Sequence, residues 1–449
     1  MKRIFSKRAL AALIFPLVIE LLLTLLVGMI DSVMVSSAGE AAVSGVSLID
    51  TVFQLLIYIF AAFGTGGAVV AGQYLGAGQR ERASETADQL VWFSGLVSVG
   101  IMGIIYLIRG FLLGTVFGSI TQEVHWNANR YLLIVALSIP ALSIYESGAA
   151  VFRTMGNSKI TMILSAVMNA VNICGNAILI YGFRLGTAGA AIATVAARYT
   201  AAVLMILLLL RSNQPLCLTR SWRFSPNGDL IRRILQIGVP NGVENGLFQL
   251  GKIILAGLVA RFGTAAITAN AICQTLASIQ VIPGSAISLA ATTVIARCVG
   301  AGDEKQTRYY NRTLLAITYG AMVLFCGAIW FALPTVLGWY HLSAETALLA
   351  TRMVLIHTLG AVVIWPLTFV LPSSMRAAGD VRFAMVTSIV SMFVFRLGAA
   401  WLFALTLHMG AAGVWYAMLC DWGFRAAVFC LRWRTGGWKN KSVIQTDKA

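Results

Sequence analysis

The stretch Pro16-Leu17-Val18-Ile19-Glu20, followed by Asp31, lies within a hydrophobic segment that we place at residues 9–34. An acid in the hydrocarbon core of a bilayer is energetically costly, so it is treated as functional by default. Glu20 and Asp31 are eleven residues apart, and at about 100° and 1.5 Å per residue they share one helix face. Pro16 removes a backbone donor one turn before Glu20, which allows a bend. The stretch predicts a membrane helix with a polar face beside a hinge.

The rest of the chain has the composition of a helical membrane protein. Its 449 residues are 59% hydrophobic and only 11% charged, which excludes a soluble globular domain. We count twelve segments long enough to cross a bilayer as helices, and we expect the eighth at 264–296. The predicted fold class is therefore an all-α polytopic membrane protein with 12 transmembrane helices.

The positive charges predict the orientation in the membrane. Of the 33 Lys and Arg residues, 24 fall at the two termini and in the even-numbered loops. Because cytoplasmic loops carry an excess of Lys and Arg, we expect both termini in the cytoplasm. We predict a multi-pass protein of the plasma (inner) membrane. Nucleic-acid binding is not expected, although the formal net charge is +16.

An internal duplication divides the chain into two halves. Pairs that are 224 residues apart are Pro16 and Pro240, Glu20 and Glu244, Gly76 and Gly300, Gly78 and Gly302, and Gly186 and Gly410. Arg153-Thr-Met-Gly-Asn-Ser-Lys159 recurs as Arg376-Ala-Ala-Gly-Asp-Val-Arg382. Each half holds six spans, so the two copies insert in the same direction. This predicts two parallel six-helix lobes related by a pseudo-two-fold axis.

The predicted domains follow from this duplication. They are an N-terminal lobe (1–210), a cytoplasmic linker (211–233), a C-terminal lobe (234–432) and a cytoplasmic tail (433–449). Both Gly-Ala-Gly turns are interpreted as glycine-terminated helix ends, because neither is followed by the Lys-Ser/Thr of a Walker phosphate site. No ATP site is visible in the sequence, so any pumping should draw on an ion gradient.

The fifth span carries three amides on one face. Asn169, Asn172 and Asn176 follow the spacing i, i+3 and i+7, and Thr194 with Arg198 a turn later adds polar groups from the sixth span. Together with Asp31 they predict a polar chamber. One carboxylate with amide and hydroxyl oxygens suits Na⁺, and it equally suits a carboxyl group that binds and releases a proton.

The second half does not repeat this set. Asp31 corresponds to Leu255, Asn172 to Arg396 and Thr194 to Met418. We predict that Arg396 is a structural counter-charge, because a lone Arg facing lipid is costly. Asp421 is expected to pair with Arg425 at i+4.

Seven cysteines without a CxxC pair and four histidines without ligand-like spacing predict no disulfide framework and no metal centre. We expect no cofactor apart from a Na⁺ ion at Asp31, should Na⁺ be the coupling ion. A clustered His, Ser or paired-Asp constellation of a membrane-embedded enzyme is also not found. We therefore do not expect an enzyme.

These features together resemble the multidrug and toxic compound extrusion (MATE) family, a branch of the multidrug/oligosaccharidyl-lipid/polysaccharide flippase superfamily. The residues that carry the resemblance are Pro16 with Asp31, the Gly-Ala-Gly turns, the Asn face, Gly-Ala-Ala-Ile-Ala-Thr194, and Arg396 followed by Gly-Val-Trp415. The resemblance covers nearly the whole chain. It implies antiport of cationic or amphipathic small molecules outward against Na⁺ or H⁺. We expect a monomer whose other partners are membrane lipids.

Residue by residue, the family's first-lobe cation site maps onto Asp31, Asn172, Asn176 and Thr194. Family members often have Asp where this chain has Asn176, which leaves Asp31 as the only formal charge of that set. From the repeat and the helical phase we predict that neutralising Asp31 lets the first span bend at Pro16 and release the substrate.

The substrate cavity is predicted to be lined by polar residues of both lobes, with hinges at Pro16 and Pro240. The candidates are Glu20, Glu244, Asn169, Asn245, Gln249 and Glu146. Glu20 and Glu244 are expected to face each other as charge complements for a cationic substrate. The alternative within transport is a lipid-linked oligosaccharide flippase, which needs a strongly cationic cavity. Arg198, Lys252 and Arg396 are the residues that favour it.

Overall fold

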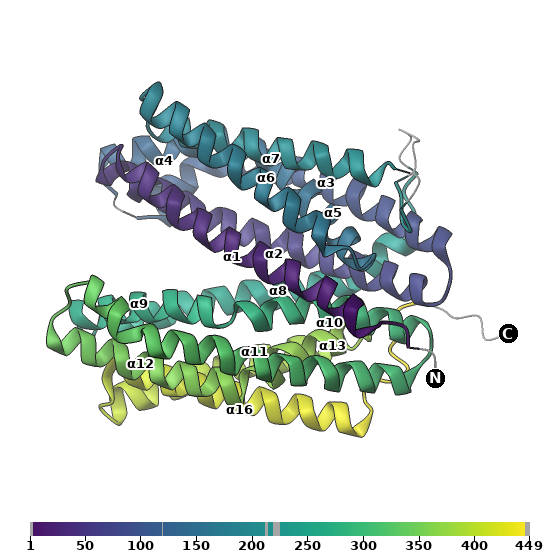
Figure 1. Cartoon of the computed structure of the whole chain (residues 1–449). Helices are drawn as coiled ribbons and strands as arrows, with labels where there is room; N and C mark the ends of the chain where they lie inside the picture. Colours follow the sequence, from purple (N-terminus) through teal and green to yellow (C-terminus); the bar gives the residue numbers. More distant parts are fainter. Residues whose placement is uncertain (1–2, 119, 212–213, 219–224, 445–449) are drawn as a thin grey trace. The chain divides into compact units, whose positions relative to one another are not determined.

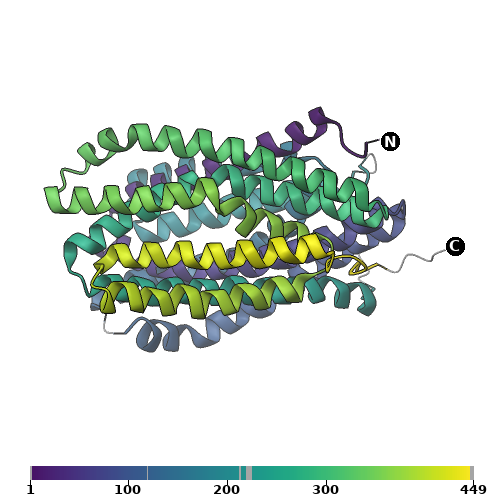
Figure 2. The same cartoon turned by 90° about the horizontal axis from the view of Figure 1, so that it is seen from below.

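The computed structural model describes residues 3–118, 120–211, 214–218 and 225–444, and its regular elements are all helical in these ranges (Figures 1 and 2). Twelve of the described helical segments are long and apolar enough to cross a membrane. The predicted all-α fold class with 12 spans is confirmed.

The described residues of the first half form seven long helices. They are α1 (Lys7–Ser36), α2 (Glu40–Gly76), α3 (Arg80–Phe111), α4 (Gln122–Val135), α5 (Ile139–Thr154), α6 (Ser158–Asn176) and α7 (Thr187–Leu209). Short turns extend or join them: η1 (Leu112–Val116), η2 (Ala136–Ser138) and η3 (Ala177–Gly182). Pro140 lies in the first turn of α5, where its missing N–H has no helical partner to lose.

The second half contains more breaks. Its α-helices are α8 (Gly228–Ala260), α9 (Thr264–Gln280), α10 (Ile282–Gly300), α11 (Glu304–Trp339), α12 (Ala344–Val363), α13 (Leu371–Ala377), α14 (Val381–Ser391), α15 (Ala399–Trp401) and α16 (Gly410–Thr435). Its π-helical turns are η4 (Pro366–Val370), η5 (Met392–Gly398) and η6 (Leu402–Thr406). Figure 2 shows α16 (yellow) lying along the run from α14 to η6.

The eighth predicted span, 264–296, is not one continuous helix. It is divided into α9 and α10 at Val281. Pro283 lies in the first turn of α10, and a proline cannot continue the hydrogen-bond ladder of a preceding helix. Hydropathy alone does not detect such a break.

The two halves form separate compact units. The first comprises Lys7–Val239, and the second begins at Pro240 and also takes the start of the chain up to Ser6. Phe5 N–H donates to Tyr310 Oη at 2.9 Å, and Tyr310 Oη donates to the Phe5 carbonyl at 2.7 Å. The boundaries therefore differ from the predicted ones, since the start of the chain packs with the second half and the division falls inside α8.

Part of the predicted linker, 211–233, is helical. α8 begins at Gly228 because Asn227 Oδ1 accepts a hydrogen bond from Leu230 N–H at 3.3 Å, which caps the helix. Asn227 also donates to Glu85 Oε1 on α3 at 2.7 Å, so this end of the linker is fixed to the first unit. Positions 212–213 and 219–224 of the predicted linker, and 445–449 of the predicted tail, lie outside the described residues.

The duplicated glycine turns end their helices in the same way. Gly78 after α2 and Gly302 after α10 have positive φ values of 79° and 68°. The next backbone N–H donates to a carbonyl five residues earlier in both copies, at 2.9 Å (Gln79 to Tyr74) and 3.1 Å (Asp303 to Cys298). This pattern is typical of a glycine-terminated helix, so the predicted structural role of the two turns is confirmed.

Candidate functional site

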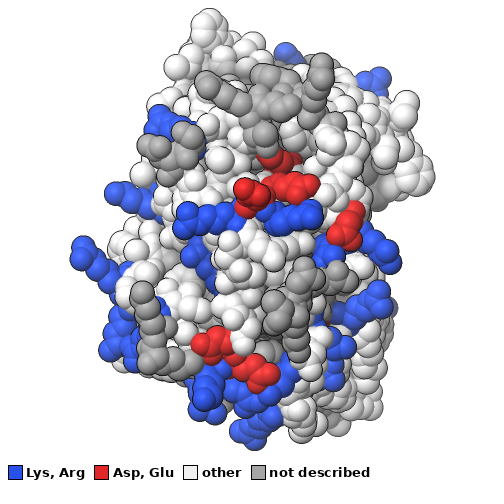
Figure 3. All heavy atoms as spheres, turned by 90° about the vertical axis from the view of Figure 1, so that its right-hand side faces the viewer, with Lys and Arg blue, Asp and Glu red and all other residues white. Residues whose placement is uncertain are grey.

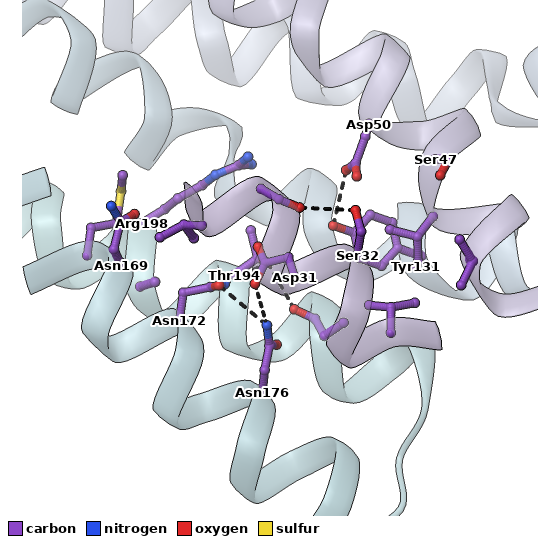
Figure 4. Close-up of a pocket in the computed structure, with 18 residues that line it drawn as sticks. Asp31, Ser32, Ser47, Asp50, Tyr131, Asn169, Asn172, Asn176, Thr194 and Arg198 are labelled. Carbon is purple, nitrogen blue, oxygen red and sulfur yellow. Dashed lines mark hydrogen bonds between the residues drawn. The ribbon is translucent and has the colours of Figure 1, made fainter. Parts of the chain in front are cut away.

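A cavity of about 190 Å³ lies inside the first unit, between α1, α2, α4, α6 and α7 (Figure 4). Its polar lining residues are Asp31, Ser32, Ser47, Asp50, Tyr131, Asn169, Asn172, Asn176, Thr194 and Arg198. All four predicted ion-coupling residues thus line one cavity. Drug-sized pockets usually measure about 300–1,000 Å³, so this cavity suits an ion with water better than a whole drug molecule.

Asp31 is the carboxylate around which the polar groups gather. Figure 4 shows Asn172, Asn176 and Thr194 grouped around it. Asn176 Nδ2 donates to Asp31 Oδ1 at 2.8 Å, and Asn176 Oδ1 is buried without a hydrogen-bond partner among the described residues. The acid therefore has a fixed donor on one side and a free amide oxygen nearby.

The Asn172 amide can take two orientations, and only one of them satisfies the hydrogen-bonding groups around it. In the orientation of Figure 4, Nδ2 donates to Thr194 Oγ1 at 3.2 Å and Oδ1 faces the Asp31 carboxylate. In the other, Nδ2 donates to the two Asp31 oxygens at 2.6 and 3.1 Å, and Oδ1 accepts from Thr194 Oγ1 at 3.2 Å. The second orientation satisfies a charged carboxylate. The first requires a proton or cation on Asp31, because two bare oxygens at hydrogen-bond distance repel.

Close packing of α6 on α7 positions these groups. A Cβ atom on Gly175 would lie 2.9 Å from Ala193 Cβ, which is closer than two carbon atoms normally approach. The glycine therefore lets the two helices approach each other closely. Asn176 follows Gly175 and Thr194 follows Ala193, so the close approach brings these two site residues together. Small residues at helix contacts commonly have this role in membrane proteins.

A second set of polar groups lines the same cavity. Tyr131 Oη donates to Asp50 Oδ1 at 3.3 Å. Arg198 Nη1 donates to Ser138 Oγ at 2.7 Å, and its guanidinium lies 4.9 Å from the centre of the Phe53 ring. Two carboxylates and one guanidinium give the cavity a formal charge of −1. Asp50 and Tyr131 were not predicted as site residues, since each is a single polar group near the end of an apolar segment.

The predicted substrate acids Glu20 and Glu244 each pair with an arginine of their own unit. Arg153 Nη1 lies 3.8 Å from Glu20 Oε1, and Arg376 Nη2 lies 2.6 Å from Glu244 Oε1. Thr161 Oγ1 also donates to Glu20 Oε2 at 2.6 Å. Each buried carboxylate is stabilised by a half-buried guanidinium of its own unit. The expectation that the two acids face each other as charge complements of a cationic substrate stays a prediction.

These two ion pairs are duplicated together with their turns. The arginines end α5 and α13, and each is followed three residues later by a glycine with positive φ, Gly156 at 83° and Gly379 at 96°. The duplicated Arg motif and the duplicated Glu were both visible in the sequence at nearly the same shift. Their common recurrence was the signal that could have identified the pairs.

The remaining predicted cavity residues are dispersed. Asn169 lines the Asp31 cavity. Glu146 is half-buried on α5, and Asn245 and Gln249 are half-buried on α8. None of these three lines that cavity, and their contact with substrate stays a prediction.

The Pro16 hinge lies inside a continuous α1. Its missing N–H leaves the Ala12 carbonyl without a helical donor. Ser158 Oγ, at the start of α6, donates to the neighbouring Leu13 carbonyl at 2.5 Å and lies 3.4 Å from the Ala12 carbonyl. The Ser158 side chain thus supplies a hydrogen bond to α1 at the turn where Pro16 interrupts the backbone ladder. Pro240 likewise lies inside α8.

Arg396 pairs with Asp421, with Nη1 3.6 Å from Oδ2. Asp421 Oδ1 also accepts from Ser391 Oγ at 2.6 Å. The expected i+4 pair of Asp421 with Arg425 is therefore wrong, because the acid is engaged by α14 and η5 across the helix interface. This geometry agrees with a counter-charge at Arg396.

Comparison with known proteins agrees with this architecture. The MatE family model matches residues 16–178 and 240–402, two windows with the same 224-residue shift as the sequence repeat. The chain is 26% identical to the uncharacterized transporter YisQ of Bacillus subtilis, over 97% of this chain and 96% of that protein. It is 24% identical to the probable multidrug resistance protein NorM of Thermotoga maritima, over 98% and 95%.

The fold is also similar to a solved structure. An outward-facing MATE transporter of the MOP superfamily superposes with a TM-score of 0.89 at 19% identity, covering 96% of both chains. The family model covers more than half of the chain in two equivalent windows. The chain belongs to the MATE family of multidrug efflux transporters.

Proposed function

We propose that the protein is a proton-coupled antiporter that exports cationic or amphipathic organic compounds, with Asp31 as the group that carries the coupling proton. The export of drugs by antiport follows from the family. The choice of the proton and of Asp31 is our inference from the cavity of the first unit.

The observation that carries this choice is the contact between Asn172 and Asp31. Asp31 Oδ1 accepts a hydrogen bond from Asn176 Nδ2 at 2.8 Å, and the Asn172 amide lies within hydrogen-bond distance of both carboxylate oxygens. Of these groups only the carboxyl group can bind and release a proton near neutral pH. A protonated Asp31 can donate to the Asn172 oxygen, whereas a charged Asp31 can accept from the Asn172 nitrogen. One amide therefore stabilises both states of the acid and needs only to rotate.

Na⁺ is the second candidate, and one observation favours it. The buried Asn176 Oδ1 has no hydrogen-bond partner among the described residues. With oxygens of Asp31, Asn172 and Thr194, it would supply the oxygen ligands that a hard cation prefers. These residues fit Na⁺ in ligand type. The described residues contain no group of three or more His, Cys, Asp or Glu side chains that could hold a metal ion, so a multivalent metal is not supported.

The proposed cycle uses the charge of Asp31. While it is charged, the cavity has a formal charge of −1 and favours the state that holds a cationic substrate. Protonation removes this charge and rotates the Asn172 amide. α1 then bends at Pro16, where the helical ladder is already interrupted, and the substrate is released.

Transport in proteoliposomes tests this proposal. Purified protein is reconstituted, and uptake or release of a fluorescent organic cation is followed under an imposed pH gradient or an imposed Na⁺ gradient. We expect the pH gradient to drive transport with no added Na⁺. Transport that follows the Na⁺ gradient alone would select the second candidate. Transport driven by neither gradient would contradict both.

The orientation and assembly are also proposed. Figure 3 looks onto the end of the molecule where α1 begins in Figure 1, and Lys and Arg outnumber Asp and Glu on this face. Because such an excess is typical of the cytoplasmic side, we place both termini in the cytoplasm. We propose that the protein acts as a monomer in the plasma (inner) membrane, surrounded by lipids and without a bound cofactor.

A further inference from the structure

Three cationic side chains of the second unit gather around one aromatic ring. The Lys252 Nζ, the Arg425 guanidinium and the Arg396 guanidinium lie 5.6, 5.7 and 6.0 Å from the centre of the Phe248 ring. They come from α8, α16 and η5, so three separate elements contribute one charge each. Cations in membrane spans normally face a protein interior or a cavity, where they pair or bind.

Only part of this charge is neutralised. Arg396 is paired with Asp421, and the adjacent Arg376 is paired with Glu244. Lys252 and Arg425 make no ion pair with a described carboxylate. Four cations against two carboxylates give the cluster a formal charge of +2.

The unpaired Arg425 is also deeply buried. Arg425 is only 2% exposed. Its Nε and Nη1 groups have no hydrogen-bond partner among the described residues. Its Nη2 reaches only the Thr368 carbonyl, at 3.4 Å. The Nε of Arg396, a residue that is 7% exposed, likewise lacks a partner there. Buried guanidinium donors without acceptors are costly, and a bound anion would satisfy them.

The backbone at this place differs from that of the first unit. Arg396 lies on the π-helical turn η5, whereas the equivalent Asn172 lies within regular α6. π-Helical turns inside helices are frequent at functional sites. Asn172 of the first unit thus contributes an amide to the cavity around Asp31, whereas Arg396 at the equivalent position of the second unit places a guanidinium on a π-helical turn.

We propose that Lys252, Arg396 and Arg425, gathered around Phe248, form a binding site for the carboxylate of an aromatic or amphipathic organic anion. The half-buried Phe369, whose ring centre lies 4.8 Å from the Arg425 guanidinium, adds apolar surface for the body of the ligand. Two unpaired cations match one carboxylate with a small excess. Lys252 is exposed and Phe248 is half-buried, which gives the ligand an approach from their side of the cluster.

The binding site itself is argued without the proposed transport function, and only its role in the transport cycle rests on that function. If the carboxylate belongs to a substrate, the protein accepts zwitterions and anions besides cations. If it belongs to a free organic anion, the anion accompanies the transport cycle as a bound counter-ion. The shared chemistry is a carboxylate, and it can be tested by binding without any transport.

Calorimetric titration of the full-length protein in detergent micelles tests the site. The probes are benzoate, its uncharged analogue methyl benzoate, the zwitterion para-aminomethylbenzoate, and inorganic phosphate as a competitor, in a buffer without added chloride. We expect benzoate to bind at least about tenfold more tightly than methyl benzoate. We expect Arg425→Gln and Lys252→Gln each to lower this ratio by about tenfold.

Controls separate a lost site from a lost fold. Arg434→Gln removes an exposed charge on α16, and it should leave the ratio unchanged. Lys252→Gln alters an exposed residue, so it keeps the test valid should Arg425→Gln fail to fold. Transport of benzoate or of the zwitterion in proteoliposomes, lost in Lys252→Gln, would identify the carboxylate as part of a substrate, and binding without transport would identify a free anion.

Several results would overturn the site. Equal affinity of benzoate and methyl benzoate in the unmodified protein is one. An unchanged ratio in well-folded Lys252→Gln and Arg425→Gln is another. A third is displacement of bound benzoate by phosphate at a concentration below that of benzoate. It would show that the site prefers phosphate to a carboxylate. If the site fails while a pH gradient still drives export of cations, the proposed transport function stands alone.

Discussion

The two units place opposite chemistry at equivalent positions. In the first, Asn172 belongs to an acidic cavity around Asp31. In the second, Arg396 takes the place of Asn172 within a cluster of formal charge +2, and Leu255 takes the place of Asp31. The framework around both is nevertheless shared, with a Glu–Arg ion pair and a glycine-terminated turn in each unit.

This difference shows which parts of a duplicated transporter are constrained by folding and which are free to diverge. The turns and ion pairs recur because each half must end and join the same helices. The interior polar groups do not recur, which agrees with our proposal that ion coupling belongs to the cavity of the first unit alone. The second half can then carry a different ligand chemistry at the same level of the fold.

The largest effect is expected from Asp31→Asn, which removes the charge that distinguishes the first unit. Ion-driven efflux should fall by roughly 100-fold, because the coupling free energy between ion and substrate is lost. Efflux should also lose its dependence on the pH gradient. Transport in proteoliposomes measures both. Asp229→Asn, an exposed acid at the start of α8 that pairs with Arg233, is the matched control and should retain transport.

The second prediction concerns Arg396→Asn, which introduces at this position the residue type of the equivalent Asn172. Arg396→Asn leaves Asp421 buried without its cation, which should destabilise the protein by about 3–5 kcal/mol. Thermal unfolding in detergent measures this loss. The double variant with Asp421→Asn should recover most of it, because neither member of this ion pair is then left as a buried charge without its partner. A double variant as unstable as the single one would show that Arg396 is not a counter-charge to Asp421.

The third prediction compares the duplicated ion pairs. Glu244→Gln should destabilise by about 2–3 kcal/mol, since it removes a close, buried partner of Arg376. Glu20→Gln should cost only about 1 kcal/mol, because its ion pair is longer, at 3.8 Å, and Gln can keep the hydrogen bond from Thr161. The unfolding temperatures of the two variants give the comparison. An equal loss in both would mean that the pairs are equivalent despite their different lengths.

The smallest effect is expected at the shared turns. Gly78→Ala and Gly302→Ala should each cost about 1 kcal/mol, because both residues have positive φ and an L side chain is strained there. A Cβ at either position meets no atom within 4 Å, so only the backbone contributes. Gly100→Ala, at an open helical position without positive φ, is the control and should not destabilise. Unequal losses at the two turns would contradict their structural equivalence.

The sequence by itself determined the number of spans, the duplication and most of the acidic cavity. Long apolar segments leave the backbone no alternative to helices in a bilayer. The spacing of Asn169, Asn172 and Asn176 requires one face of a helix, and the structure brings that face to Asp31 and Thr194. These inferences succeed because helical periodicity is a local property of the chain.

Only the tertiary structure decided which charged groups meet. Glu20 finds Arg153, and Asp421 finds Arg396 in place of the nearer Arg425. Phe248 collects three cations from elements that are far apart in the sequence. Such partners depend on how neighbouring helices rotate and shift against each other, and that is set by the packing of many small and apolar side chains. No single residue pattern records it.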